Sequence, residues 1–219
     1  MGEKNNIIKL IGLGAGGHAK VLIDILQHDG KYSIEGLLDS NKDLCGRKIM
    51  GLPVLGDDSL LPAMGRRGIT HFFVAIAGVG DNKPRKRLFE LALYHGLKPI
   101  RIVHPSACIS DFSAINVGTT VMANAVVNAG TEIGKNAIIN TGSIIEHDCV
   151  ICDHVHVATG ARLASSCRVE AGAHIGVGAT VLQSTTIGEN AIIGAGAVVI
   201  DDVPPETVVI GIPARPLNQ

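Results

Sequence analysis

The sequence predicts two domains in series, a small α/β domain at residues 1–102 and an all-β solenoid with a C-terminal tail at residues 103–219. Short apolar runs alternate with amphipathic stretches before residue 102, whereas a strict six-residue period begins at Ile109. The composition changes at the same place, because 14 of the 19 Lys and Arg residues lie before Arg101. The two parts of the chain are therefore expected to fold by different rules.

The first domain is predicted from the order of its elements. Strands are expected at the apolar runs 6–14, 32–40, 70–77 and 98–103, and helices at the amphipathic stretches 18–28, 57–68 and 84–96. Strands that alternate with helices predict a small parallel sheet, the Rossmann-like half of an α/β fold. Only 3% of the residues are aromatic and none is Trp, so the core is expected to consist of Val, Ile, Leu and Ala.

The second domain is predicted from its six-residue period. All sixteen positions from Ile109 to Val199, taken in steps of six, are aliphatic, and the residue four positions after each is small or β-branched. Six residues turn an α-helix by about 600°, so a helix would not present these side chains on one face. A solenoid of very short strands and turns does so, with the aliphatic residues inward and the small residues at the bends.

A glycine motif near the N-terminus indicates a phosphate site. Gly12, Gly14 and Gly17 have G-x-G-x-x-G spacing after the first expected strand, and Asp39 ends the next strand. Such glycines let backbone N–H groups approach a phosphate at a helix N-terminus. A domain of about 100 residues lacks a second mononucleotide half, which favours a single diphosphate ligand. An NAD-dependent oxidoreductase or a non-catalytic nucleotide sensor stays open as an alternative.

The stretch from Ile144 to His156 is rich in side chains that bind metals or move protons. It holds three His, two Cys and three acidic residues, including a C-x-x-C at Cys149 and Cys152. Cys149 occupies the small-residue position of its hexad, and neighbouring strand residues point to opposite sides. A closed zinc site needs about four convergent ligands, so no metal is predicted here.

Two resemblances extend this interpretation. The hexads that fill nearly all of residues 103–203 resemble the hexapeptide-repeat family, whose fold is a left-handed parallel β-helix with three hexads per coil. The segments "NTGSIIEHD" and "HVHVATGA" resemble the active-site segment of bacterial nucleotide-sugar acetyltransferases. That family includes N-acetyltransferases of nucleotide-linked 4-amino-4,6-dideoxy sugars and related sialic acid O-acetyltransferases.

The resemblance implies roles for the residues of these segments. It makes His147 the general base, Asp148 its supporting carboxylate and His156 a contact of the acetyl group of acetyl-CoA, and it places Asn140 near the sugar's amino group. A His with a pKa near 6.5 can accept the amine's proton at neutral pH, for roughly 10² to 10⁴ in rate. With eighteen residues per coil, His174 is expected directly above His156, and His147 on another face.

The resemblance also implies two binding surfaces. Gly16, Gly17 and His18 match positions at the substrate's phosphates, Asp39 and Ser40 match positions near its base or ribose, and Ala77 closes this site. Coenzyme A is expected beside Ser165, Val177, Ala195 and Arg215. A solenoid with outward Ala, Val and Ile leaves apolar wall exposed, which predicts a subunit interface. The resemblance implies that the assembly is a homotrimer with its sites between neighbouring subunits.

The sequence thus predicts an acetyl-CoA-dependent N-acetyltransferase of nucleotide-linked amino sugars, serving the synthesis of surface glycans such as lipopolysaccharide. An O-acetyltransferase of sialic acid or another sugar is the close alternative. A remoter one is a γ-type carbonic anhydrase, whose metal would be held by His147, His156 and His174 from adjacent subunits.

Charge and composition exclude other classes of partner. The net charge of −1 argues against a nucleic-acid partner, which requires a basic surface. The longest apolar runs fall short of the roughly 18 residues of a membrane span, and no signal peptide is recognisable, so a cytoplasmic protein is expected. Five cysteines, an odd number, are expected to be reduced thiols.

Overall fold

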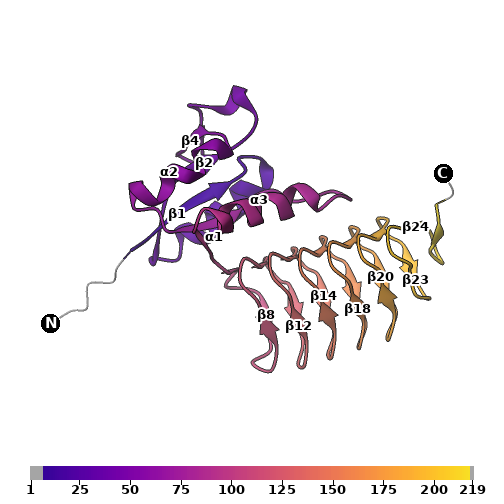
Figure 1. The fold of residues 1–219 in the computed structure, drawn as a ribbon. Coiled ribbons are helices and arrows are strands. Elements are labelled where there is room, and N and C mark those ends of the chain that lie inside the picture. The colour runs from indigo at the N-terminus through magenta and orange to yellow at the C-terminus, as the bar shows by residue number, and fades with distance from the viewer. Residues whose placement is uncertain (1–6, 218–219) are drawn as a thin grey trace. The chain divides into compact units, whose positions relative to one another are not determined.

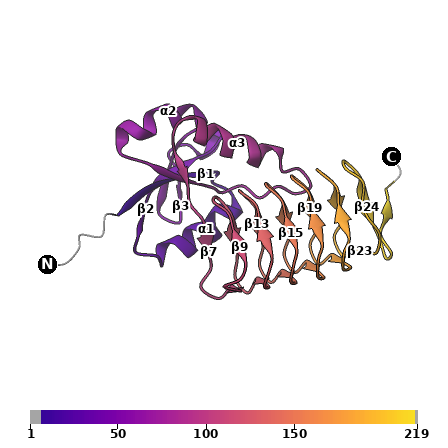
Figure 2. The same cartoon turned by 60° about the horizontal axis from the view of Figure 1, so that its bottom comes forward.

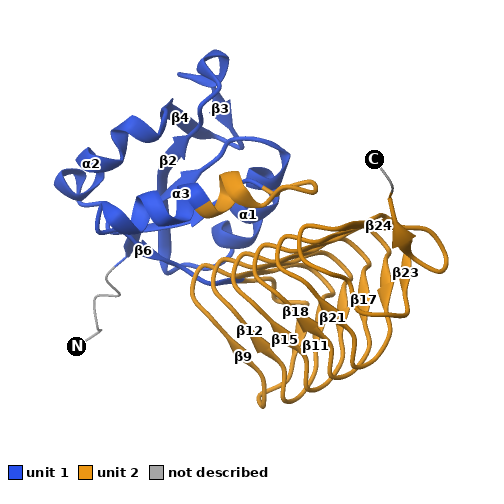
Figure 3. Ribbon diagram, turned by 45° about the vertical axis from the view of Figure 1, so that its right-hand side comes forward, with its two compact units in different colours: residues 1–76, 87–102 blue, residues 77–86, 103–219 orange. Residues whose placement is uncertain are grey.

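A computed structural model describes residues 7–217, and the chain divides into two compact units (Figure 3). Residues up to 76 and residues 87–102 form unit 1, and residues 77–86 together with those from 103 onward form unit 2. The ten residues 77–86, here called the inserted segment, therefore pack with the second unit although they interrupt the first in sequence. No helix within residues 7–217 has the length and apolar character that crossing a membrane requires.

Unit 1 is built on a six-stranded sheet of order β3-β4-β2-β1-β5-β6 (Figure 1). Its strands are β1 (Ile8–Leu13), β2 (Tyr32–Leu38), β3 (Lys48–Ile49), β4 (Leu52–Gly56), β5 (His71–Val74) and β6 (Lys98–Pro99). Its helical elements are α1 (Gly17–Gln27), η1 (Lys42–Leu44), η2 (Asp58–Leu60), α2 (Leu61–Met64), η3 (Gly65–Arg67) and, across the boundary of the units, α3 (Lys83–Tyr94). All its pairings are parallel except β3 with β4, which confirms the predicted parallel sheet.

Two local predictions for unit 1 differ from the structure. The stretch expected as a helix at 57–68 is helical, but it forms two 3₁₀ turns around the four-residue α2 instead of one regular α-helix. Pro62 lacks the N–H that would bond the carbonyl four residues earlier, which interrupts the regular α-helical hydrogen bonding there. The hairpin of β3 and β4 was not expected; Met50 and Gly51 turn it with φ of 48° and 84°.

Unit 2 is a parallel β-helix whose strands, of two residues each except the three-residue β24, form three faces (Figures 1 and 2). Face 1 contains β7 (Ile102–Val103), β10 (Thr120–Val121), β13 (Ile138–Ile139), β16 (His156–Val157), β19 (His174–Ile175), β22 (Ile192–Ile193), β24 (Val208–Ile210) and β25 (Arg215–Pro216). Face 2 contains β8 (Cys108–Ile109), β11 (Val126–Val127), β14 (Ile144–Ile145), β17 (Arg162–Leu163), β20 (Thr180–Val181) and β23 (Val198–Val199). Face 3 contains β9 (Ala114–Ile115), β12 (Glu132–Ile133), β15 (Val150–Ile151), β18 (Arg168–Val169) and β21 (Thr186–Ile187).

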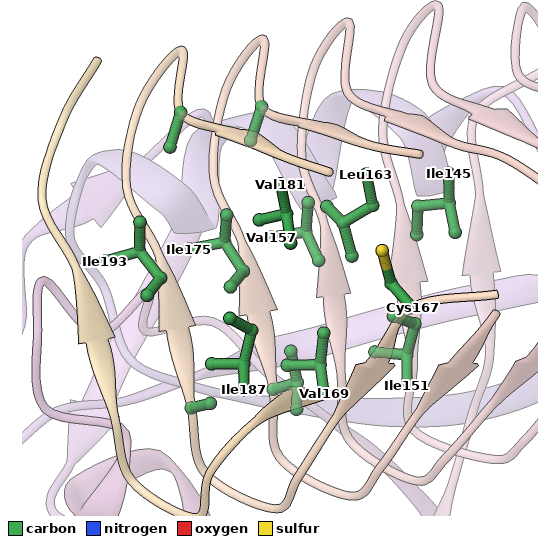
Figure 4. Packing of buried hydrophobic residues seen from close by; sticks show 14 of the residues in the cluster. Ile145, Ile151, Val157, Leu163, Cys167, Val169, Ile175, Val181, Ile187 and Ile193 are labelled. Carbon is green, nitrogen blue, oxygen red and sulfur yellow. The ribbon is translucent and has the colours of Figure 1, made fainter. Parts of the chain in front are cut away.

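The aliphatic residues of the hexads form the interior of the β-helix. Between Val121 and Val199 each of them is at most 1% exposed, and the small residues four positions later also point into this core. Figure 4 shows the side chains of successive coils, such as Val157 and Ile175, stacked along the axis. Burying each Val, Ile or Leu stabilises the fold by about 1.5–3 kcal/mol. The predicted inward placement is confirmed.

The turns of the β-helix depend on a left-handed residue. Every sixth residue from Gly118 to Gly196 has a positive φ, and Gly, Asn, Asp, Ser and His all occur there. Residues other than Gly reach this conformation with some strain, and Asn and Asp do so most readily. The frequent Gly and Asn residues of the hexads therefore reflect turn geometry.

Candidate active site

The glycine motif of unit 1 contains glycines of two kinds. A Cβ on Gly12 would lie 2.6 Å from Leu37 Cδ2, and one on Gly14 would lie 2.6 Å from Ile76 Cγ2, so packing requires both glycines. A Cβ on Gly16 or Gly17 would meet nothing within 4 Å. Packing within the chain therefore does not require glycine at positions 16 and 17. These two glycines leave open space at the start of α1.

The N-terminus of α1 has the features of an anion site. Gly16 is the N-cap and has no side chain to accept from the first N–H groups, and the first turn carries no acidic residue. Asp39 holds the loop from the other side: its Oδ2 accepts from Ala15 N (2.7 Å) and its Oδ1 from Asn41 N (2.8 Å). The helix dipole and the backbone N–H groups that point out of the N-terminus of a helix would favour a phosphate here.

The other residues of the first domain that were predicted to contact the substrate are His18, Ser40 and Ala77, of which the first two lie near this loop and the third belongs to unit 2. His18 is half-buried in the first turn of α1, and Ser40 is exposed beside Asp39. Both Asp39 and Ser40 follow the carboxyl end of β2, the neighbour of β1, where ligands of parallel sheets bind. Ala77, half-buried, is the first residue of the inserted segment and belongs to unit 2.

In unit 2, His147 and Asp148 form an exposed pair in the turn after β14. Asp148 Oδ2 lies 2.8 Å from His147 Nδ1, and the two side chains are 56% and 65% exposed. A carboxylate only accepts, so Nδ1 carries the proton and donates it to Asp148. His147 Nε2 then presents its lone pair outward, as a general base requires.

His156 is buried on face 1 and has a defined tautomer. Its Nδ1 lies 2.8 Å from the carbonyl of Gly78, which can only accept, so Nδ1 carries the proton. Its Nε2 lies 3.1 Å from Asn140 Nδ2 and accepts from that amide. In this arrangement the His156 ring has no second N–H that it could donate to an oxyanion. Asn140, which was predicted to lie near the sugar's amino group, instead bonds and orients His156.

His174 lies one coil beyond His156, as the eighteen-residue coil predicts. Their strands pair in register, and the two rings meet edge to face with centroids 4.9 Å apart. His174 is 7% exposed, and its Nδ1 has no hydrogen-bond partner among the described residues. Burial lowers the pKa of His174 below 6.5, because it penalises the imidazolium.

Replacing His174 by Ile is expected to make the stability less dependent on pH. At pH values between the lowered pKa of the folded state and 6.5, the unfolded chain binds more protons at the His174 ring than the folded protein does. The contribution of this ring to the free energy of unfolding is therefore complete above pH 6.5 and is lost as the pH falls. Ile fits the column, because Ile138 and Ile192 hold the equivalent positions. Denaturation midpoints between about pH 5 and 7 measure the effect; parallel curves for wild type and His174→Ile would contradict it.

Residues predicted to contact coenzyme A occupy two columns of turns on unit 2. Ser165 lies one coil beyond His147, since the N–H that follows Ser165 donates to the His147 carbonyl (3.0 Å). Val177 and Ala195 follow β19 and β22, and the N–H after Ala195 donates to the Val177 carbonyl (2.8 Å). The column of His147 and Ser165 lies along the edge between faces 2 and 3, and the column of Val177 and Ala195 lies along the edge between faces 1 and 2. The two columns therefore border face 2 on both sides.

Arg215, the fourth predicted coenzyme contact, lies apart from these columns in β25. Its Nη1 lies 3.5 Å from Asp201 Oδ2 and donates to the carbonyl of Ala214 (2.9 Å). Its side chain is 59% exposed. A coenzyme phosphate would therefore compete with Asp201 for this guanidinium.

Two cysteines of unit 2, Cys149 and Cys167, lie in its core, whereas Cys108 is exposed and Cys152 is half-buried. Cys149 is fully buried, and its Sγ donates to the carbonyl of Ala164 (3.2 Å). Hydrogen bonding to Cys167, together with burial, raises the pKa of Cys149. Such a thiol is a poor nucleophile. Within residues 7–217, no three His, Cys, Asp or Glu side chains are grouped closely enough to hold a metal.

Sequence reasoning missed the inserted segment, which covers part of face 1. Besides the Gly78 contact to His156, Asn82 Nδ2 donates to the carbonyls of Gly172 (3.0 Å) and Ala173 (3.1 Å). Arg85 is 1% exposed and donates to the carbonyl of Asn136 from Nη2 (2.7 Å). Burial lowers the pKa of Arg85 to about 9, so the guanidinium is charged at neutral pH.

Protein-family models match both parts of the chain. Residues 9–92 match the PglD N-terminal domain, and residues 130–165 and 166–201 match the six-repeat bacterial transferase hexapeptide model. The first match covers the glycine loop and the inserted segment, and the second covers the His147–Asp148 pair and the columns beside face 2.

Known proteins are similar over most of the chain. A GDP-perosamine N-acetyltransferase of Escherichia coli O157:H7 is 35% identical over 68% of this chain and 66% of its own. A perosamine N-acetyltransferase of Caulobacter crescentus, solved with CoA and GDP-perosamine as a variant of one histidine, is 38% identical over 96% and 97%, with a TM-score of 0.90. The acetyltransferase domain of PglB from Neisseria gonorrhoeae, solved with acetyl coenzyme A, is 35% identical over 97% and 100%, with a TM-score of 0.87.

These matches confirm the predicted fold, an α/β domain followed by a left-handed parallel β-helix. They also confirm the resemblance on which the predicted roles rest, since the similar proteins that share both parts of the chain are acetyltransferases. The chain therefore belongs to the hexapeptide-repeat acetyltransferases that carry a PglD-type N-terminal domain.

Proposed function

We propose that the protein transfers the acetyl group of acetyl-CoA to the amino group of a nucleotide-linked amino sugar. The observation that carries this proposal is the exposed His147–Asp148 pair, whose geometry leaves Nε2 of His147 free to accept a proton. Relatives of this chain at 35–38% identity were solved in complex with acetyl coenzyme A, or with CoA and GDP-perosamine. These complexes support acetyl-CoA as the donor and a nucleotide-linked amino sugar as the acceptor. GDP-perosamine is therefore the first acceptor to test.

In the proposed reaction the sugar amine attacks the thioester carbonyl directly. A carbon–nitrogen bond forms, His147 Nε2 takes the proton that the nitrogen loses, and the carbonyl oxygen becomes an oxyanion. Collapse of this intermediate breaks the carbon–sulfur bond, and the CoA thiolate receives the proton from the imidazolium. Asp148 holds the tautomer and stabilises that imidazolium, as the carboxylate of a catalytic triad does.

Two features of unit 2 favour this route over its variants. Cys149 is buried, which disfavours an acyl-cysteine intermediate. Both ring nitrogens of His156 are engaged by Gly78 and Asn140, so a backbone N–H is the better donor to the oxyanion. His156 is then a contact of the acetyl group through its ring.

Unit 1 is proposed to hold the nucleotide end of the acceptor. The open N-terminus of α1 at Gly16 and Gly17 would take the diphosphate, with His18 beside it. Asp39 and Ser40 would lie near the ribose or base. Because both carboxylate oxygens of Asp39 already accept backbone N–H groups, its first role is to hold this loop in place.

The active assembly is proposed to be a homotrimer with its sites between subunits. Val177 (56% exposed), Leu182 (37%) and Ile200 (41%) expose apolar side chains at the turns that border face 2. Exposed apolar wall of this kind normally marks an interface. Coenzyme A would then lie along face 2 beside Ser165, Val177 and Ala195, where a neighbouring subunit completes the site.

The experiment is an assay of thiol release from acetyl-CoA with a panel of acceptors: GDP-perosamine, UDP- and dTDP-linked 4-amino-4,6-dideoxy sugars, and their 4-hydroxy analogues. Release is expected with at least one amino sugar and not with its hydroxy analogue. The product should resist hydroxylamine, as an amide does and an ester does not. Release with the hydroxy analogues and a labile product would instead support the O-acetyltransferase alternative.

A further inference from the structure

Gly130 lies one coil before Asp148, in the same column of turns. Its φ is 73° and that of Asp148 is 59°, so both occupy the left-handed turn position. The N–H of Asp148 donates to the carbonyl of the residue before Gly130 (3.0 Å). A Cβ built on Gly130 would overlap Oδ1 of Asp148, whose other oxygen faces His147.

The turn conformation does not itself require glycine at this position. The same left-handed position is held by Asn124, Asn136, Ser166 and Asn190 in other coils. What glycine supplies at 130 is the space into which the Asp148 carboxylate folds. The clash would fall on the end of an exposed side chain, so the carboxylate would move while the fold stays intact.

We propose that Gly130 is a positioning residue for the reaction: it leaves room for the Asp148 carboxylate to reach His147 Nδ1 and so fixes which ring nitrogen is the base. This inference rests on the proposed function, in which His147 is the base. Gly96, which follows α3 in unit 1 and belongs to no proposed site, offers a matched comparison, because its φ is 78° and a Cβ there would meet nothing within 4 Å.

The test compares wild type, Gly130→Ala, Gly96→Ala and Asp148→Asn by two measurements. Nitrogen-15 NMR of the His147 ring reports the tautomer: wild type and Gly96→Ala should carry the proton on Nδ1, and Gly130→Ala and Asp148→Asn should lose that preference. In the acetyl-transfer assay, Gly130→Ala should lower kcat roughly tenfold or more with little change in KM. Gly96→Ala should retain the wild-type kcat.

An unchanged tautomer in Gly130→Ala, or a loss of kcat equal to that of Gly96→Ala, would overturn the proposal. If Gly130→Ala does not fold, Gly130→Asn replaces it, since Asn tolerates this turn position in three other coils. The NMR measurement needs no turnover. A tautomer shift in an enzyme without acetyl transfer would therefore support the positioning role and count against the proposed function alone.

Discussion

Replacing His147 by alanine is expected to lower kcat for acetyl transfer by about 10²- to 10⁴-fold. The amine must lose a proton as it attacks the thioester, and Nε2 of His147 is the exposed acceptor that the Asp148 carboxylate orients. The side chain is 56% exposed in a turn, so its removal should leave the β-helix and its assembly unchanged. Steady-state kinetics and sedimentation of the same sample measure both.

The matched control is His104→Ala, which removes another imidazole of unit 2. His104 Nδ1 bonds Ser106, in the coil at the start of the β-helix, far in sequence from the proposed base. This variant should turn over at the wild-type rate. Near wild-type turnover of His147→Ala would instead remove His147 as the base, whatever its effect on KM.

Replacing Ile187 by alanine is expected to destabilise the protein by about 2–5 kcal/mol, the usual cost of a cavity in a packed core. Ile187 is fully buried in β21, and its strand pairs with the strand of Val169 one coil earlier. Each coil of a solenoid contacts only its neighbours, so the coils on both sides of the cavity lose packing. Denaturant midpoints at one fixed protein concentration measure the loss.

Val117→Ala serves as its control, because this valine is 47% exposed and lies at a turn between faces 3 and 1, outside the proposed subunit interface. It should change the stability by roughly 0.5 kcal/mol or less. Equal destabilisation by the two substitutions would contradict the assignment of the hexad residues to the core. It would mean that the six-residue period does not determine which side chains are buried.

Most of the β-helix could be predicted because one physical constraint repeats. Each coil needs an aliphatic residue inward at the same three positions, so an unbroken period from Ile109 to Val199 determines the register of every strand. Unit 1 was less predictable in its short elements. Pro62 interrupts a stretch whose apolar spacing is helical, and the two-residue β3 is too short to produce a period.

The candidate site was predictable where side chains act in sequence-local pairs. His147 and Asp148 are adjacent, and the eighteen-residue coil brings His174 to His156. The contact of Gly78 with His156 spans 78 residues and uses a backbone carbonyl, for which sequence offers no signal.

The burial of Arg85 could have been predicted from the spacing of apolar residues in α3. Arg85 precedes the buried Phe89 and Ala92 by four and seven residues, which places it on the buried face of the helix. An arginine there needs carbonyl partners, and Asn136 and Ala137 supply them. The stretch 84–96 was predicted only as an amphipathic helix, with no role for Arg85.

The most direct test of the central claim is a crystal structure of the protein with CoA and the acceptor sugar that the panel identifies. The sugar's amino nitrogen is expected about 2.6–3.2 Å from His147 Nε2, with the CoA sulfur beside the same nitrogen. A bound sugar whose amine lies beyond hydrogen-bond reach of His147, directly or through one water, would contradict the account.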